Sequence, residues 1–374
     1  MTHTSTEPTI INPSNLLANI PGILGFHPQE SMVFFLFEQD LPPSDFVDYP
    51  PFFVLGPVLR CDVKNSQQRK TVLRTIKDLQ PELVFAAIIS SELGEKQAAK
   101  EAARTARQAE RYGVPIECTW YVSELFTGSP YSVVHGETGA NLGPLTSGIE
   151  EWAAGKVGNI LGSLSMQEML DNGDLPAATR DESLAFLSAD NPFMMPSDVA
   201  SLTNLAINFG HSAVQAITEG DAEERDYVFT ALMSQWQELC TTVMDQDLYP
   251  GDLMANEDLL SVAAVYFANI RIRDCILDSA FGPEARAMFR ISVAIARSTT
   301  GIVRSNALCG VALSAPHIGA SYRSGQAIQL AEEHDCRHGL TVLLREAQLA
   351  GGVELMTQAC SAGSRLAREN LLGT

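Results

Sequence analysis

Strand-like and helix-like patterns are segregated along this sequence, and the segregation limits which folds it can adopt. Short apolar runs occur at residues 31–37, 52–63, 82–90 and 114–125. Helical patterns separate the last three of these runs from one another. From residue 197 onward only helical patterns occur. Strands that alternate with helices are typical of α/β sheets. We therefore predict an α/β N-terminal domain with a mainly parallel sheet, followed by an all-α C-terminal domain.

The length of 374 residues is about twice that of a usual domain, so we expect two domains. Glycine and proline become frequent around residues 129–144, where we place the end of the first domain. The predicted organisation is a disordered tail at 1–11, an α/β sheet domain at 12–144, a linker with short helices at 145–196, and an all-helical domain at 197–374.

The all-helical domain is predicted to consist of helical hairpins. Apolar residues recur with a period of 3.6 in eight stretches, at 197–219, 222–245, 257–279, 284–297, 302–314, 317–333, 337–350 and 352–370. Small residues at Ala320, Ser324, Ala327 and Ala331 favour close helix approach. This architecture is similar to tetratricopeptide packing, although the fixed 34-residue signature of that repeat is absent.

The charge balance argues against two classes of partner. With 25 basic and 45 acidic residues the net charge is −20, which opposes binding to nucleic acid and to anionic membranes. No apolar run is long enough for a membrane span, and the first ten residues lack a signal-peptide pattern. Seven scattered cysteines without a C-x-x-C motif fit buried thiols in a reducing cytoplasm.

The stretch at residues 12–37 predicts a short helix, a corner and a buried strand. Asn12 is suited to cap the helix and Pro13 to occupy its first position, whereas Pro21-Gly22 is expected to end it. A continuous apolar run follows, as in strands covered on both faces. The residues given a structural role at this corner are Pro21, Gly25, Phe26, Pro28 and Ser31.

His27, at the corner, allows two interpretations. An imidazole at a strand entry has a pKa near neutrality and can act as an acid or base. We favour the other interpretation, in which His27 is a solvated turn residue and the corner is structural. Asp62 follows a strand, where open α/β sheets bind ligands. It is a candidate for a metal or ribose ligand, or a cap of the helix that begins near Asn65.

Two further motifs point only weakly to chemistry. The glycines at 136–143 do not match a phosphate-binding loop, and we expect a flexible linker there. His334 and His338 would share one helix face at a spacing suited to zinc, but no third ligand is evident, so we expect no metal site. Arg273 and Asp274 lie in an amphipathic helical pattern. The main expectation there is an ion pair that pins neighbouring helices or caps a buried helix end, and ligand or partner binding is the alternative.

Several segments resemble one family. NLLANIPGILGFHPQESMVFFLF (residues 15–37) resembles the opening motif of the actinobacterial family known as domain of unknown function 4192. LRCDV (residues 59–63) is similar to its second strand, which ends at Asp62, and RIRDCIL (residues 271–277) to its helical Arg-Asp motif. The linker at 143–163 and the hairpin at 306–352 also resemble it. The resemblance implies this fold, an actinobacterial cytosol and no established reaction.

We expect a non-catalytic interaction or regulatory protein that binds a protein partner through its helical domain and the domain junction. The alternative is a small-molecule enzyme or ligand sensor with a site at the carboxyl end of the sheet, facing the helical domain near Asp62, His27 and Arg273. We favour the former because the sequence has no G-x-S-x-G elbow and no Cys/His nucleophile context. We expect no cofactor. Pro57 indicates an exposed edge strand, so we also consider a homo-oligomer.

Overall fold

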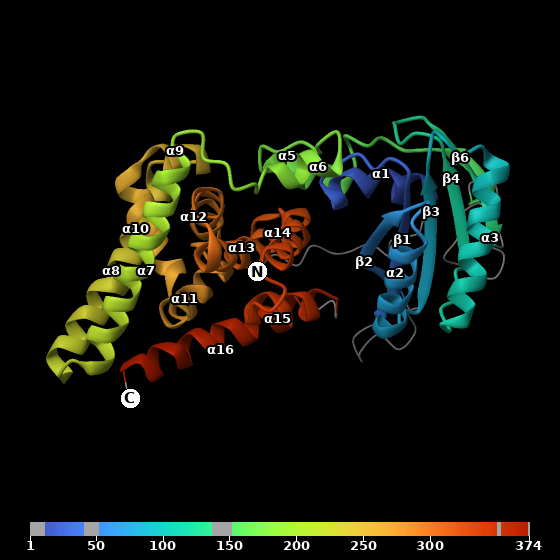
Figure 1. The fold of residues 1–374 in the computed structure, drawn as a ribbon. Helices are drawn as coiled ribbons and strands as arrows, with labels where there is room; N and C mark the ends of the chain where they lie inside the picture. The colour runs from blue at the N-terminus through green and yellow to red at the C-terminus, as the bar shows by residue number, and fades with distance from the viewer. Residues whose placement is uncertain (1–11, 41–51, 137–151, 350–352, 373–374) are drawn as a thin grey trace. The chain divides into compact units, whose positions relative to one another are not determined.

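The computed structural model describes residues 12–40, 52–136, 152–349 and 353–372 of the protein (Figure 1). The chain divides into two compact units, Met1–Arg180 and Asp181–Thr374. The predicted tail at 1–11 and most of the predicted glycine-rich linker at 136–143 lie outside the described residues. No helix in the described ranges has the length and apolar character needed to cross a membrane.

The first unit is built on a six-stranded sheet with the order β2-β1-β3-β4-β5-β6. Its elements are α1 (Pro13–Leu24), β1 (Ser31–Asp40), β2 (Phe52–Asp62), α2 (Ser66–Leu79), β3 (Leu83–Ile89), α3 (Glu95–Arg111), β4 (Cys118–Val122), β5 (Pro130–Gly136), β6 (Ala154–Lys156) and α5 (Leu164–Asp171). Only β3 and β4 pair in parallel, and the other four neighbouring pairs are antiparallel.

The sheet is therefore mixed, and the prediction of a mainly parallel sheet is wrong. The strands joined through helices, β2, β3 and β4, do run in one direction, as the alternation of strands and helices indicated. However, β1 inserts antiparallel between β2 and β3. β5 follows β4 after a short turn, which allows only an antiparallel return. Pro57 lies on the edge strand β2, opposite a register shift between Phe35 and Phe37, as its missing N–H requires.

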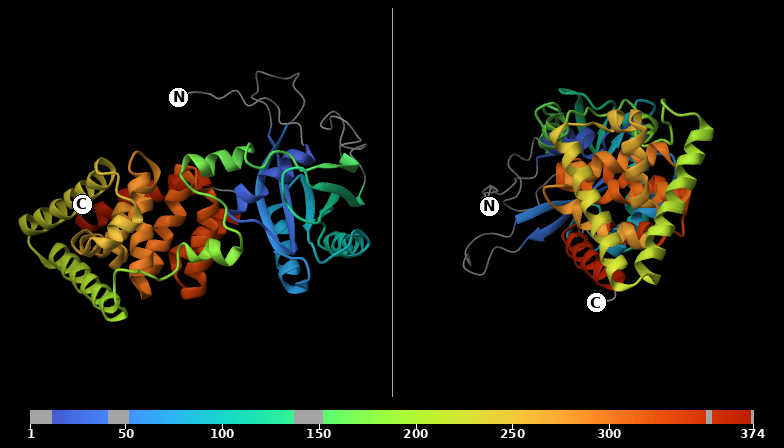
Figure 2. Two further views of the ribbon diagram at one scale, coloured as in Figure 1. Left: turned by 90° about the horizontal axis from the view of Figure 1, so that it is seen from above. Right: turned by 90° about the vertical axis from the view of Figure 1, so that its left-hand side faces the viewer.

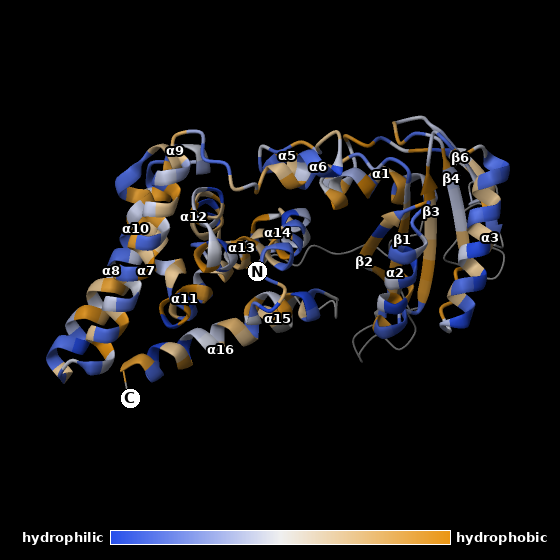
Figure 3. Cartoon of the chain, viewed as in Figure 1, coloured by the Kyte–Doolittle hydropathy of each residue, from blue (hydrophilic) through white to orange (hydrophobic). Residues whose placement is uncertain are grey.

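Two hydrophobic cores cover the two faces of the sheet. Val33 and Phe35 of β1 face one core, which α1 and α5 close, and Phe34 and Leu36 face the other, which α2 and α3 close. Residues 31–37 are all buried, as predicted for a strand covered on both faces. Figure 3 shows β3 as a continuous hydrophobic strand for the same reason.

The first unit extends beyond the predicted boundary at residue 144. β6 pairs with β5, and Trp152 is 1% exposed in the core closed by α1 and α5. The segment at 154–156 is therefore a strand, where the sequence pattern predicted a helix. Gly22 of α1 packs so closely on α5 that an added Cβ would lie 2.4 Å from Ser165 Oγ. These contacts place what was predicted as a linker partly inside the first unit.

The second unit is built of helices joined by loops, with no strand among its described residues (Figures 1 and 2). It contains α6 (Arg180–Ala185, which begins at the last residue of the first unit), α7 (Pro196–Glu219), α8 (Ala222–Asp245), α9 (Pro250–Ala255), α10 (Glu257–Ala268), α11 (Ile270–Ile276), η2 (Leu277–Phe281), α12 (Ala285–Ser298), α13 (Gly301–Ser314), η3 (Ala315–Ile318), α14 (Ser321–His334), α15 (Gly339–Leu349) and α16 (Val353–Leu372). α13 is the central helix, because every residue from Val303 to Ser314 is buried.

Candidate functional site

One edge of the sheet collects the ends of four strands. Ser31, the first residue of β1, pairs with Ile89 at the end of β3 and with Asp62 at the end of β2. Ile89 in turn pairs with Val122 at the end of β4. The carboxyl ends of the two parallel strands therefore lie beside the entry of β1. Ligands of open α/β sheets bind outside such carboxyl ends.

A hollow of about 160 Å³ opens at this edge. Its walls come from three segments that are distant in sequence, namely the corner before β1, the residues after β3 and the turn after β4. The corner is built as predicted, since Gly25 adopts a left-handed φ of 75° and Ser31 begins the strand. One detail differs from the expectation that Pro21-Gly22 ends the helix. α1 continues through Pro21 to Leu24, and Pro21 O accepts a hydrogen bond from the Gly25 N–H. The residues that line the hollow include His27, Gln29, Ser91, Glu124, Leu125 and Phe126.

His27 is half-buried at this hollow, and thus differs from the solvated turn residue expected from the sequence. Its Nδ1 atom is buried without a hydrogen-bond partner in the described part of the chain. Burial lowers the pKa of His27, so the neutral imidazole is favoured near neutral pH. The ring lies 6.4 Å from that of Phe126, centroid to centroid. A group that enters the hollow can therefore satisfy a buried nitrogen beside an aromatic ring.

Glu30 holds the corner against the loop after β3, a role that the sequence analysis missed. Its carboxylate accepts hydrogen bonds from Ser90 Oγ at 2.6 Å, from Ser91 N at 3.0 Å and from Glu92 N at 3.2 Å. Its φ of 44° is left-handed, which is uncommon for a residue other than glycine and costs about 1–3 kcal/mol. Strained backbone of this kind clusters at functional sites. Nothing in the local sequence pattern signals it.

Asp62 ends β2 at the same edge but does not line the hollow with His27. Its Oδ1 lies 2.6 Å from Arg60 Nη2 in an ion pair. It is not the cap of α2, because Asn65 accepts from the backbone N–H groups of Gln67 and Gln68 at 3.1 Å. The corner and Asp62 therefore do not converge on one ligand, and the described contacts of Asp62 are those of a structural residue.

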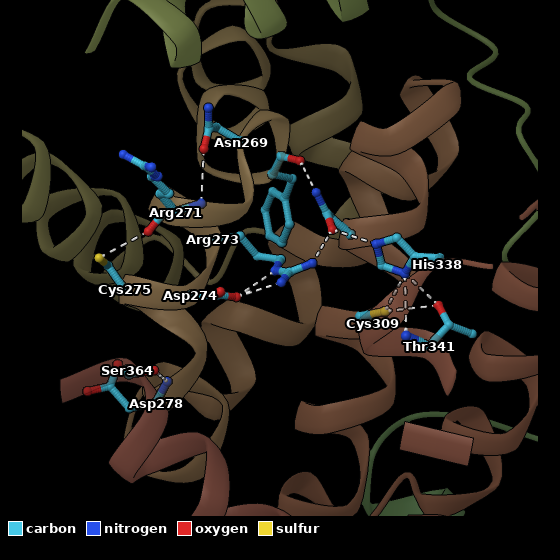
Figure 4. Close-up of polar contacts among 12 residues, drawn as sticks. Asn269, Arg271, Arg273, Asp274, Cys275, Asp278, Cys309, His338, Thr341 and Ser364 are labelled. Atoms are coloured by element: carbon cyan, nitrogen blue, oxygen red, sulfur yellow. Dashed lines mark hydrogen bonds and ion pairs between the residues drawn. The ribbon is translucent and has the colours of Figure 1, made fainter. Parts of the chain in front are cut away.

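Arg273 and Asp274 belong to the second unit and form an ion pair within α11, not between two helices as the main expectation had it (Figure 4). The Nε and Nη2 groups of Arg273 both donate to Asp274 Oδ1, at 2.9 and 2.6 Å. Its Nη1 donates to Asn306 Oδ1 of α13 at 2.6 Å. The Arg273 side chain is 9% exposed, so these bonds stabilise a charge that is nearly removed from water. The hydrogen bond from Arg273 to Asn306 joins α11 to α13.

His338 extends this network. Asn306 Nδ2 donates to Phe267 O at 2.8 Å, so Oδ1 is the acceptor and His338, 3.0 Å away, donates its Nε2–H to it. His338 Nδ1 is then an acceptor for Thr341 Oγ1 at 2.7 Å. Cys309 Sγ lies 3.7 Å from Nδ1, but burial raises the pKa of this thiol to about 11. The thiol therefore stays protonated and is not an activated nucleophile.

The predicted pairing of His334 with His338 on one helix face does not form. His334 is the last residue of α14, whereas His338 is buried just before α15 begins. Within the described ranges no three His, Cys, Asp or Glu side chains are grouped in a way that could hold a metal ion. His338 instead acts as a buried structural residue that connects α13 to the start of α15.

Comparison with known proteins confirms the family that the sequence segments suggested. The model of a family described as Domain of unknown function (DUF4192) matches residues 13–353. The chain belongs to this family. Neither a curated protein nor a solved structure matches it. The residues matched by the DUF4192 model include both the hollow beside His27 and the Arg273 network.

Proposed function

We propose that this protein is a non-catalytic interaction protein, and that the hollow beside His27 anchors one side chain of a protein partner. The size of the hollow carries this proposal. At about 160 Å³ it is smaller than the roughly 300–1,000 Å³ of pockets that enclose small molecules. It suits the end of a single side chain, and this favours an interaction protein over the alternative of an enzyme with its site at this edge.

The chemistry of the rim favours a lysine or arginine of the partner. Phe126 is 59% exposed, and a cation is attracted to the face of an aromatic ring. Glu124 is exposed on the same rim and offers a carboxylate. A neutral His27 does not repel a cation and can accept a hydrogen bond. The net charge of −20 also attracts a basic partner over longer distances.

The helical unit is the second contact surface in this proposal. Leu205 and Phe209 are 54% and 62% exposed, and they lie one turn apart on α7. Exposed apolar side chains that share a helix face are typical of surfaces that bind partners. Tetratricopeptide-like stacking of the helical hairpins belongs to the same proposal. We also place the protein in an actinobacterial cytosol, where its seven free cysteines would remain reduced.

The proposal is tested by affinity purification of the full chain from its own host. Wild type is compared with Phe126→Ala, which removes the exposed ring, and with Leu175→Ala as a matched control. Leu175 is 65% exposed in the same unit but does not line the hollow. We expect one or more proteins to be recovered with wild type and the control, and recovery to fall about tenfold or more with Phe126→Ala.

Two results would contradict the proposal. Identical sets of recovered proteins from all three variants would show that the hollow does not bind a partner. A native mass that exceeds the denatured mass by one small molecule, lost on Phe126→Ala, would instead support the enzyme or sensor alternative. Both measurements use the same purified material.

A further inference from the structure

A larger cavity, of about 430 Å³, lies within the helical unit. Its walls come from α8, from η2 with the turn that follows it, and from α16. Gln237, Gly282 and Pro283 line it and are exposed, so the cavity is open to solvent. Its volume falls in the range of pockets that hold small molecules, unlike the hollow beside His27.

A directed chain of hydrogen bonds ends in this cavity. Trp236 Nε1 donates to Ser279 Oγ at 2.9 Å, and Ser279 donates its hydroxyl hydrogen to Glu284 Oε2 at 2.6 Å. The indole N–H can only donate, which fixes the direction of the chain. Trp236 and Ser279 are 3% and 7% exposed, so the half-buried Glu284 is fixed by a hydrogen-bond chain that starts in the core. One carboxylate oxygen accepts this bond, and the other accepts no hydrogen bond from the described residues.

The charge on the cavity wall is negative. Asp278 is paired with Arg368, whose Nη2 lies 2.6 Å from its Oδ1, and Arg368 Nε donates to Cys275 O at 2.9 Å. Glu284 has no ion-pair partner within the described ranges, although Arg368 lines the same cavity. Two carboxylates and one guanidinium therefore leave one negative charge. Met233 and Pro283 supply apolar surface beside it.

We propose that this cavity binds a small organic cation, an alkyl- or arylammonium ion. Its N⁺–H groups would donate to the Glu284 carboxylate, and its apolar body would lie against Met233 and Pro283. Charge-assisted hydrogen bonds of this kind are roughly twice as strong as neutral ones. A metal ion fits poorly, because no group of three metal-ligating side chains occurs in the described part of the chain. The site lies in the helical unit and is independent of the proposed partner site beside His27.

The test is a calorimetric titration of the full chain with phenethylammonium, and with 2-phenylethanol as a neutral analogue of similar shape. We expect one saturable site for the cation and binding at least about tenfold weaker for the alcohol. Glu284→Gln keeps an acceptor for Ser279 but removes the charge, and should weaken cation binding about tenfold or more. Glu219→Gln, which alters an exposed carboxylate on α7, is the matched control and should bind as wild type does.

Further probes and variants make a negative result decisive. Methylammonium and butylammonium are titrated alongside, so that the length of the apolar body is varied. Met233→Trp places a larger side chain on the cavity wall and should weaken binding, whereas Phe126→Ala should not change it. Absence of saturable binding for all three ammonium ions overturns the proposal. Equal affinities of wild type and a folded Glu284→Gln or Met233→Trp variant also overturn it.

Discussion

His338 Nε2 lies 3.0 Å from Asn306 Oδ1, the same oxygen that accepts a hydrogen bond from Arg273 at 2.6 Å. Two donors therefore converge on one buried amide oxygen. Asn306 is 0% exposed and passes the network on by donating to Phe267 O. The amide joins α11, α13 and the segment before α15. Because one of its donors is a charged guanidinium, its loss would leave a buried charge poorly solvated.

Asn306→Ala should lower the free energy of unfolding by about 2–4 kcal/mol, because it leaves Arg273 Nη1 and the Nε2–H of His338 without their acceptor. Urea-induced unfolding followed by far-ultraviolet circular dichroism measures this loss. Ser305→Ala is the matched control on the same helix, since the Ser305 hydroxyl is buried without a hydrogen-bond partner among the described residues. The control should cost about 1 kcal/mol or less, and equal losses for both variants would contradict the prediction.

Stability should fall as the pH decreases through the titration of His338. Burial, and then the charge of Arg273, lower the pKa of His338 in the folded protein, whereas Asp335 acts in the opposite direction. Below about pH 6.5 the unfolded chain takes up a proton on this imidazole that the folded chain does not. The stabilising contribution is complete above that pH and is lost as the pH falls through the lower, folded pKa.

The measurement is the free energy of unfolding between pH 8 and pH 5 for wild type and His338→Gln. We expect a shallower pH dependence in the variant, and the difference between the two curves isolates His338 from the other histidines. His211→Gln, at an exposed position of α7, should leave the wild-type slope unchanged. Parallel curves for wild type and His338→Gln would disprove the assignment.

Gly25→Ala should destabilise the corner before β1 by about 1–2 kcal/mol, because Gly25 has a φ of 75° that L-residues adopt at a cost. A lower thermal midpoint of the full chain reports this change. Gly339→Ala, at the start of α15, is the comparison, because a Cβ there meets no atom of the described part of the chain within 4 Å. That substitution should stabilise the protein by about 0.4–1 kcal/mol. A midpoint raised by both variants would be inconsistent with the strained corner.

Cysteine reactivity should divide into three classes. Cys336 is exposed and Cys360 is partly exposed, whereas the other five cysteines are buried. Burial raises the pKa of Cys118 to about 12 and that of Cys61 to about 11. In the native protein one thiol should react rapidly with a chromogenic disulfide and a second slowly, and the rest should react only after unfolding. Cys336→Ser should remove the rapid phase, and its persistence would show that a buried thiol is accessible.

The helices of the second unit are predictable because their signals are local. The predicted stretch at 222–245 coincides with α8, Ala222–Asp245, and that at 197–219 differs from α7 by one residue. The hydrophobic period and the capping residues at helix ends act over a few turns of helix, so a local stretch of sequence is enough to predict where a helix begins and ends. The stretch at 257–279 is an exception, since Asn269 interrupts it and caps α11 by accepting from Arg271 N at 2.9 Å.

The candidate sites were predictable only in part. The corner at Gly25 and the ion pair of Arg273 with Asp274 follow from short motifs. The orphaned Nδ1 of His27 and the strain at Glu30 depend on segments after β3 and β4, about 60 and 100 residues away. Trp236 and Glu284 meet through Ser279 in the same non-local way.

The sequence by itself determined the positions of most helices, the entry into β1 and the burial of the central strands of the sheet. Propensity, capping and hydrophobic period are properties of neighbouring residues, so a local pattern contains them. Only the tertiary structure decided that β1 lies between β2 and β3, and that Asn306 serves both Arg273 and His338. Strand partners and buried polar contacts join residues far apart in the chain. Their free energies depend on packing that no single segment specifies.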